Sequence, residues 1–113
     1  DIHVNIIGGG RVDGPSAGAA IFLAIYSALE GIPLRQDVAV TGELSIQGNV
    51  CGVGGITEKI YGARQIGVNK VLVPQANSRE LPDEMWGVQV VKIDEVTEAF
   101  PHIIFSEGSV REN

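Results

Sequence analysis

Hydrophobic residues recur along the chain with two different periods, which predicts both strands and helices. Short runs rich in Val and Ile predict strands at residues 2–7, 38–40, 44–46, 50–53, 70–74 and 88–93. Apolar residues at helical spacing predict helices at 16–30 and 56–66, with short helical turns at 77–81 and 95–100. The elements alternate without regular βαβ repeats. We therefore expect one mixed α/β or α+β domain over residues 1–105, with mixed sheets and packed helices, followed by a polar tail at 106–113.

Local signals refine several of these elements. The helix that begins at Ser16 is apolar on nearly every side, so we expect it to be deeply buried. The loop at 47–49 contains a glycine and predicts a hairpin between the strands on either side. Asn77 and Ser78 are expected to cap the short turn at 77–81, and Pro101 is expected to end the last helical turn.

Composition narrows the class of protein. The chain has 113 residues, enough for one domain, and its net charge of −6 with no cluster of Lys and Arg argues against nucleic-acid binding. Cys51 is the single cysteine, so an internal disulfide and a cysteine-based zinc site are excluded, and we expect it to be a small core residue. No signal peptide or membrane span is visible. The single cysteine fits a reducing, cytoplasmic setting, while membrane tethering of a longer parent protein stays open. The abrupt start at Asp1 suggests a piece cut from a longer protein at a domain edge.

A glycine-rich loop joins the first strand to the first helix. The segment from Gly9 to Ser16 has P-loop spacing, but Pro15 stands where a P-loop has its lysine and Asp13 adds a negative charge, so nucleotide binding is disfavoured. The same loop suits acyl transfer, because free N–H groups and the dipole at a helix start can stabilise an oxyanion through the backbone of Ser16 and Ala17. From the loop alone, an N-cap role for Ser16 is favoured over a nucleophile.

A serine nucleophile requires a base, and the chain offers few candidates. His3 and His102 lack a carboxylate pattern that could orient them, so a Ser-His-Asp triad is disfavoured. Lysine can serve as a base in a setting that favours its neutral form, and Lys59 lies in the first turns of an apolar helix after Gly54 and Gly55. On spacing alone, a solvated surface lysine is the favoured interpretation of Lys59.

Three ordered blocks change this picture. The segment 13–18, Asp-Gly-Pro-Ser-Ala-Gly, resembles the sequence around the catalytic serine of Lon proteases. The segments 41–43, Thr-Gly-Glu, and 54–59, Gly-Gly-Ile-Thr-Glu-Lys, resemble the second and third blocks of that family, and residues 67–74 resemble its next strand. The blocks occur in the family's order, and the resemblance covers roughly residues 1–100.

The resemblance implies a function for each matched residue. Ser16 would be the nucleophile of a serine endopeptidase and Lys59 its general base, with Ser16 and Ala17 supplying oxyanion-hole N–H groups. Thr41 would hold the Lys59 amine in place, and Glu43 would be a supporting polar residue. Asp13 would either cap the helix or lie near Lys59 and keep it charged in a resting state.

The family also implies partners beyond this chain. Its members cleave unfolded or misfolded proteins with an AAA+ ATPase module, fused or separate, and assemble as rings, usually hexamers. The N-terminal strands of the typical domain and the ATPase module are absent here, so ATP and Mg²⁺ are implied only for a module elsewhere, and we expect neither cofactor nor metal in this chain. Two alternatives remain open: a catalytically silent Lon-like oligomerisation or scaffold domain, and a small ligand-binding α/β module.

Overall fold

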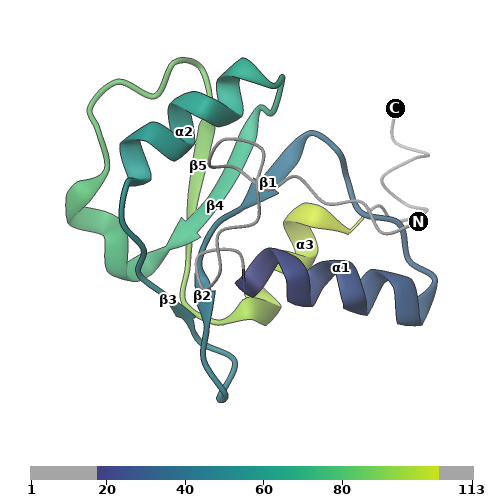
Figure 1. Cartoon of the computed structure of the whole chain (residues 1–113). Coiled ribbons are helices and arrows are strands. Elements are labelled where there is room, and N and C mark those ends of the chain that lie inside the picture. The colour runs from purple at the N-terminus through teal and green to yellow at the C-terminus, as the bar shows by residue number, and fades with distance from the viewer. Residues whose placement is uncertain (1–17, 105–113) are drawn as a thin grey trace.

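The computed structural model describes residues 18–104, which form helices on both faces of a small parallel sheet (Figure 1). The α-helices are α1 (Gly18–Glu30), α2 (Ile56–Gln65) and α3 (Phe100–Ile103), and two 3₁₀ helices are η2 (Gln75–Glu80) and η3 (Val96–Ala99). The strands are β1 (Val38–Val40), β2 (Glu43–Leu44), β3 (Val50–Cys51), β4 (Lys70–Pro74) and β5 (Gln89–Ile93).

The central sheet has the order β1-β4-β5, and both of its pairings are parallel. Val38 pairs with Lys70 and Val40 with Leu72, so the two strands begin together and end at the same edge. The strands β2 and β3 form a separate antiparallel hairpin. Backbone hydrogen bonds from Val50 to Asp94 and from Val96 to Gly48 attach this hairpin to the chain just after β5, at the carboxyl edge of the sheet.

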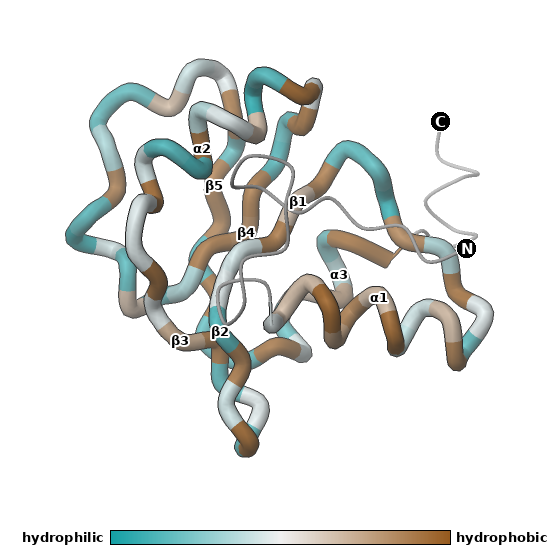
Figure 2. Tube along the Cα trace, in the orientation of Figure 1, coloured by the Kyte–Doolittle hydropathy of each residue, from teal (hydrophilic) through white to brown (hydrophobic). Residues whose placement is uncertain are grey.

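Alternation along the strands divides the core between the two faces of the sheet. One cluster joins α1 and α3 to the sheet through Val38, Val40 and Leu72. The other joins α2 to the sheet through Ala39 and Val71, together with Val73. Successive residues of a strand point to opposite faces, so these short strands are apolar throughout because both of their faces are covered. Figure 2 shows the result as mainly hydrophobic strands inside a more polar periphery.

The predicted mixed α/β class is confirmed, and so are the hairpin, the strand 70–74 and the helix after Gly55. Element ends differ by a few residues. The strand expected at 44–46 is Glu43–Leu44, and Ile46 lies fully exposed in the turn that follows. The strand expected at 50–53 ends at Cys51, whose side chain is only partly buried, so the expectation of a core cysteine is wrong. A free thiol at this position therefore borders the core without filling it.

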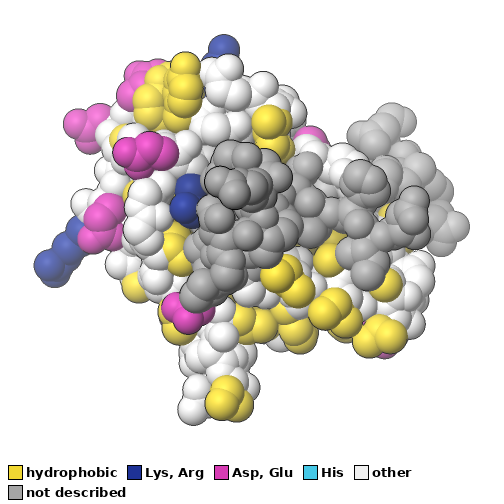
Figure 3. Space-filling view, viewed as in Figure 1, with side chains coloured by type: hydrophobic (Ala, Val, Ile, Leu, Met, Phe, Trp, Pro, Cys, Tyr) yellow, Lys and Arg dark blue, Asp and Glu magenta, His cyan; other side chains and the backbone are white. Residues whose placement is uncertain are grey.

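The burial expected for the first helix is also wrong within the described residues. Ala19, Ala20, Leu23 and Ala24 are buried, whereas a second group of apolar side chains is exposed: Ile21, Phe22, Ile25 and Leu29. Figure 3 shows hydrophobic side chains gathered along this helix. The three alanines and Leu23 form the buried side of α1, and Leu23 packs with Ala19 into the core cluster that contains Val38 and Val40 of β1.

Two short helical turns differ from the predictions as well. Pro101 does not end a helix; it lies in the first turn of α3, where its missing N–H costs no intrahelical hydrogen bond. The turn after β4 begins at Gln75 and has no side-chain cap, so the capping function expected of Asn77 is wrong. No helix among residues 18–104 is long and apolar enough to cross a membrane.

Candidate active site

The carboxyl edge of the sheet brings together two of the three sequence blocks. Thr41 directly follows β1, and its N–H donates to the Leu72 carbonyl at 3.0 Å, which extends the strand pairing by one residue. By strand alternation Thr41 shares the face of Ala39, the face covered by α2. Its side chain is 2% exposed, and its Oγ1 has no hydrogen-bond partner among the described residues. Buried hydroxyls are nearly always paired, so this orphaned oxygen marks a place where a partner group is expected.

Gly42 brings the start of α1 to this edge. The Ala19 N–H donates to the Gly42 carbonyl at 3.0 Å. Gly42 has a φ of +151°, and a Cβ there would lie 2.3 Å from Val50 Cγ1, so only glycine fits. A Cβ on Gly18 would lie 3.0 Å from the Leu44 nitrogen, which shows how closely α1 approaches β2. The glycines of the first two blocks therefore allow α1 to begin against the residues that follow β1.

The remaining residues of these two blocks are placed less fully. Glu43 is exposed in β2, where it pairs with Cys51, and its Cα lies 3.7 Å from the position of a Gly18 Cβ. Glu43 thus borders the start of α1 without being enclosed there. The candidate residues Asp13, Ser16 and Ala17, and also His3, lie outside the described residues.

The third block forms the turn into α2. Gly55 is the N-cap in the left-handed conformation, with a φ of 67°, and the Lys59 N–H donates to its carbonyl at 3.0 Å. Lys59 is partly buried, and its Nζ lies 3.8 Å from the position of a Gly55 Cβ. The side chain therefore folds back toward the helix start, the direction in which helical side chains lean.

This position is electrostatically unusual for a cation. Positive charge at a helix start opposes the helix dipole. No carboxylate among residues 18–104 forms an ion pair with Lys59. A lysine that breaks a local rule without a compensating partner in this part of the chain is a candidate for a functional group.

Asn77 is a site residue whose function the sequence did not indicate. It is buried in η2, and its side-chain amide hydrogen-bonds both backbone groups of Val53, just before the glycine turn. Nothing in the local pattern points to this contact, because the two residues lie 24 positions apart. A polar residue directly after an apolar strand is most simply interpreted as part of a turn.

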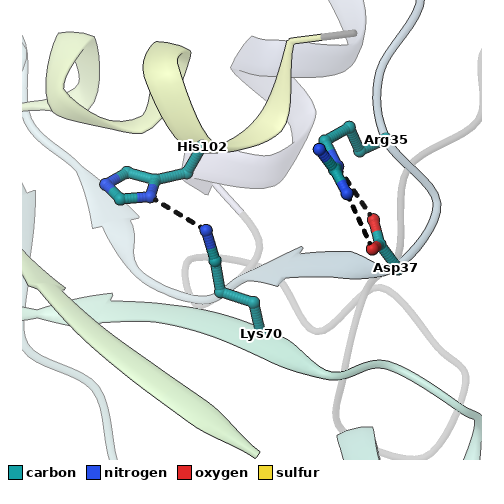
Figure 4. Close-up of polar contacts among 4 residues, drawn as sticks. All are labelled: Arg35, Asp37, Lys70 and His102. Carbon is teal, nitrogen blue, oxygen red and sulfur yellow. Dashed lines mark hydrogen bonds and ion pairs between the residues drawn. The ribbon is translucent and has the colours of Figure 1, made fainter. Parts of the chain in front are cut away.

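The opposite edge of the sheet carries the remaining titratable pairs (Figure 4). Lys70 Nζ lies 3.3 Å from His102 Nδ1. Burial, together with the charge of Lys70, lowers the pKa of His102 and favours the neutral ring that accepts this hydrogen bond. Lys70 begins β4, whereas the Thr41 N–H bonds to Leu72, two residues farther along that strand. His102 therefore lies at the opposite edge from Thr41, and no carboxylate among residues 18–104 forms an ion pair with it.

A salt bridge lies beside this pair. Arg35 Nε and Nη2 donate to the two carboxylate oxygens of Asp37 at 3.1 and 3.0 Å. These hydrogen bonds lower the pKa of Asp37. Within residues 18–104 no group of three His, Cys, Asp or Glu side chains could hold a metal ion.

Comparison with known proteins adds a family match. Residues 1–105 match the model of the Lon protease (S16) C-terminal proteolytic domain. The chain is 41% identical over 109 residues to a Lon protease of Brucella suis biovar 1 (strain 1330), covering 92% of this chain and 13% of the relative. It is 38% identical over 104 residues to Lon protease 2 of Bacillus subtilis (strain 168), covering 92% of this chain and 19% of the relative. An archaeal Lon protease of Pyrococcus abyssi (strain GE5 / Orsay) is 41% identical over 102 residues, covering 87% of this chain and 10% of the relative. The chain thus spans less than a fifth of the length of these relatives.

Proposed function

Because the chain belongs to the family of Lon protease C-terminal proteolytic domains, a serine peptidase family, we propose that it cleaves peptide bonds with Ser16 as nucleophile and Lys59 as general base. The single observation that carries the pairing is the buried Oγ1 of Thr41, which has no hydrogen-bond partner among residues 18–104 and lies on the face covered by α2, next in sequence to the Gly42 that accepts the Ala19 N–H of α1. In the proposed site this hydroxyl would lie between the block that supplies the nucleophile and the block that supplies the base.

The placement of α1 supports a nucleophile at this edge. Gly18 lies against β2, and Ser16 is two positions earlier in the sequence, a separation that spans at most about 7 Å of chain. The Ala19 N–H is already used by the Gly42 carbonyl. The oxyanion would therefore be stabilised by N–H groups nearer the start of the helix, and the proposal assigns them to Ser16 and Ala17.

Thr41 gives the lysine its orientation. A lysine side chain has several rotatable bonds, and a base that is not held in place transfers protons poorly. The Thr41 hydroxyl, which has one donor and two acceptor positions, can hydrogen-bond an amine in either protonation state. A bond to Lys59 would satisfy Oγ1 and hold Nζ at the carboxyl edge of β1.

The reaction then proceeds in two halves. Lys59 removes the proton from Ser16 Oγ as this oxygen attacks the scissile carbonyl carbon, and the oxyanion forms against the backbone N–H groups. The intermediate collapses, the C–N bond breaks, and Lys59 returns the proton to the leaving amine, which leaves an acyl-enzyme. Lys59 next deprotonates a water molecule that attacks the ester, and Ser16 is released with its proton.

The wider context of the chain belongs to the same proposal. We assign the unfolding of substrates to an ATP- and Mg²⁺-dependent AAA+ module in cis or in trans, and the assembly to a homo-oligomeric ring, a hexamer in the simplest case, in the cytoplasm. Unfolded or misfolded proteins would be the substrates. Glu43 would support the site from β2, and Asp13 would either cap α1 or pair with Lys59 in a resting state.

Two substitutions in the full-length protein test the dyad. Ser16→Ala and Lys59→Arg should each lower turnover of a fluorogenic peptide by about 10³-fold or more, since Arg stays protonated and cannot act as a base. Lys70→Arg, at the opposite edge of the sheet, is the matched control and should keep wild-type turnover. Size-exclusion chromatography should show an unchanged assembly for all three proteins.

Each result tests the function assigned to one residue. Wild-type turnover in Ser16→Ala would remove the nucleophile, and wild-type turnover in Lys59→Arg would point to another base. A wild-type protein that assembles but cleaves no peptide would favour the silent scaffold domain instead.

A further inference from the structure

The Asn77 side chain binds one backbone residue through both of its polar groups. Its Oδ1 accepts from the Val53 N–H at 3.0 Å, and its Nδ2 donates to the Val53 carbonyl at 2.8 Å. An amide that pairs with the N–H and C=O of one residue imitates a β-bridge, and it fixes the plane of that residue as well as its position. The Asn77 side chain thus pairs with the Val53 backbone just beyond the end of β3.

The orientation of this amide is itself fixed. Nδ2 also donates to Glu80 Oε1 at 3.1 Å, and a carboxylate oxygen can only accept. Both hydrogens of Nδ2 are therefore used, and Oδ1 must face the Val53 N–H. The side chain is 5% exposed, so these bonds are shielded from water, where they are worth more than on the surface.

The segment that Asn77 holds has few other constraints. Val53 is flanked by Gly52 on one side and by Gly54 and Gly55 on the other. Glycines restrict the backbone least of all residues, so three of them around one valine make a soft connection between β3 and α2. A Cβ on Gly52 would lie 3.3 Å from Ala76 Cβ and 3.4 Å from Asn77 Oδ1, so the segment also lies directly on η2.

The same η2 turn follows the strand that holds Thr41. The Leu72 carbonyl of β4 accepts the Thr41 N–H, and η2 begins directly after Pro74. One continuous segment therefore fixes the residue beside the proposed site and, through Asn77, the turn into the helix of Lys59.

We propose that Asn77 is a positioning residue for the peptidase reaction: by clamping Val53 it sets the start of α2 and thereby the place of the Lys59 amine. This inference rests on the proposed function of Lys59. Lys59 lies one helical turn beyond Gly55, and a shift in the glycine turn would move its Nζ relative to Thr41. Displacements of about 1 Å at a catalytic group can lower a rate about 100-fold.

Two substitutions separate this function from a contribution to stability alone. Asn77→Ala removes the clamp. Asn77→Asp keeps the acceptor for the Val53 N–H but loses the donor and places a carboxylate against Glu80. Ser78→Ala is the control in the same turn, because its hydroxyl bonds to Gln75 of η2 and to no other described side chain or backbone group. Val88→Ala is the control for stability, because it weakens the same α2-side core at the other edge of the sheet.

The test uses the full-length protein and two readouts. In the wild type, hydrogen exchange should show the Val53 amide protected relative to those of Gly54 and Gly55. Both Asn77 variants should speed exchange in residues 52–58 and lower kcat for a fluorogenic peptide by about 10- to 100-fold, with KM changed by less than about 2-fold. Ser78→Ala and Val88→Ala should keep kcat, although Val88→Ala lowers the melting temperature.

The outcomes are separable from those of the dyad test. Wild-type kcat in either Asn77 variant would overturn the inference, as would a Val53 amide in the wild type that exchanges as fast as that of Gly54. The latter measurement needs no variant, so it can overturn the inference even where a substitution prevents folding. Activity retained in Lys59→Arg would instead overturn the dyad, whatever the Asn77 variants do.

Discussion

Polar side chains at the two edges of the central sheet differ in their burial and in their hydrogen-bond partners. At the amino edge, Arg35 binds Asp37 and Lys70 binds His102, each side chain with a partner and with access to water (Figure 4). At the carboxyl edge, Thr41 is buried with its hydroxyl unpartnered among the described residues, and Asn77 holds the Val53 backbone with both ends of its amide. Lys59, also toward this edge, forms no ion pair with any residue from 18 to 104.

This difference separates structural polar groups from functional ones. A surface ion pair is complete in itself and contributes about 0.2–1 kcal/mol. A buried hydroxyl without a partner costs stability and persists only if another group uses it. The charged pairs at the amino edge are the most conspicuous polar contacts. We nevertheless propose that the peptidase reaction takes place at the carboxyl edge, where the Thr41 hydroxyl has no partner among the described residues. Substitutions at the two edges should accordingly differ in kind as well as in size.

The largest expected effect is that of Gly42→Ala, at the carboxyl edge. The new Cβ would lie 2.3 Å from Val50 Cγ1 at a φ of +151°, so the turn after β1 would have to move. We expect a loss of more than about 3 kcal/mol in the free energy of unfolding. Gly62→Ala is the matched control: it lies in open space within α2 and should gain about 1 kcal/mol. Calorimetry of the full-length protein that finds the two variants equally stable would contradict the close approach at Gly42.

A smaller effect of a different kind is expected at Thr41. Thr41→Val keeps the shape and removes the hydroxyl, so kcat should fall about 10-fold or more while the melting temperature holds or rises. Thr41→Ser should do the reverse, keeping the hydroxyl and kcat but losing about 1 kcal/mol with the buried methyl group. Peptidase assays paired with thermal unfolding measure both. A Thr41→Val protein with wild-type kcat would show that the hydroxyl serves no catalytic purpose.

The smallest effect is expected at the amino edge, where His102 should affect only the pH dependence of the free energy of unfolding. Burial and Lys70 lower the pKa of His102 in the folded protein, so the unfolded chain binds this proton more readily. The contribution of the neutral ring to stability is therefore complete well above the ordinary histidine pKa of 6.5, and it is lost as the pH falls through that value toward the lowered pKa of the folded protein. His102→Gln should flatten that loss while leaving kcat unchanged. Equal slopes of unfolding free energy against pH in the two proteins would contradict it.

The parts of the fold that follow local periodicity could be predicted from the sequence. The strand at 70–74 and the helix after Gly55 have clear apolar patterns bounded by glycine and proline, and both occur where expected. The burial of α1 could not be predicted, because an apolar helix does not show which of its faces a sheet will cover. The prediction that Pro101 ends a helix was wrong because the first turn of a helix tolerates proline.

The site residues likewise differ in how far the sequence could predict them. Thr41, Glu43 and Lys59 could be found only through resemblance to a family, since spacing alone favoured a surface lysine. Neither residue spacing nor the family resemblance indicated the function of Asn77. Its partner Val53 is distant in the sequence, and an asparagine near a turn has simpler interpretations. Long-range backbone contacts of this kind become visible only once the strands are paired.

An experimental structure of the full-length protein would show the contacts of the Lys59 amine and so test the Ser16–Lys59 dyad. We predict Nζ within about 3.5 Å of both Ser16 Oγ and Thr41 Oγ1, so that the hydroxyl left unpartnered among residues 18–104 gains its partner. A Lys59 side chain that extends into solvent, with Thr41 Oγ1 bonded to some other group, would contradict it.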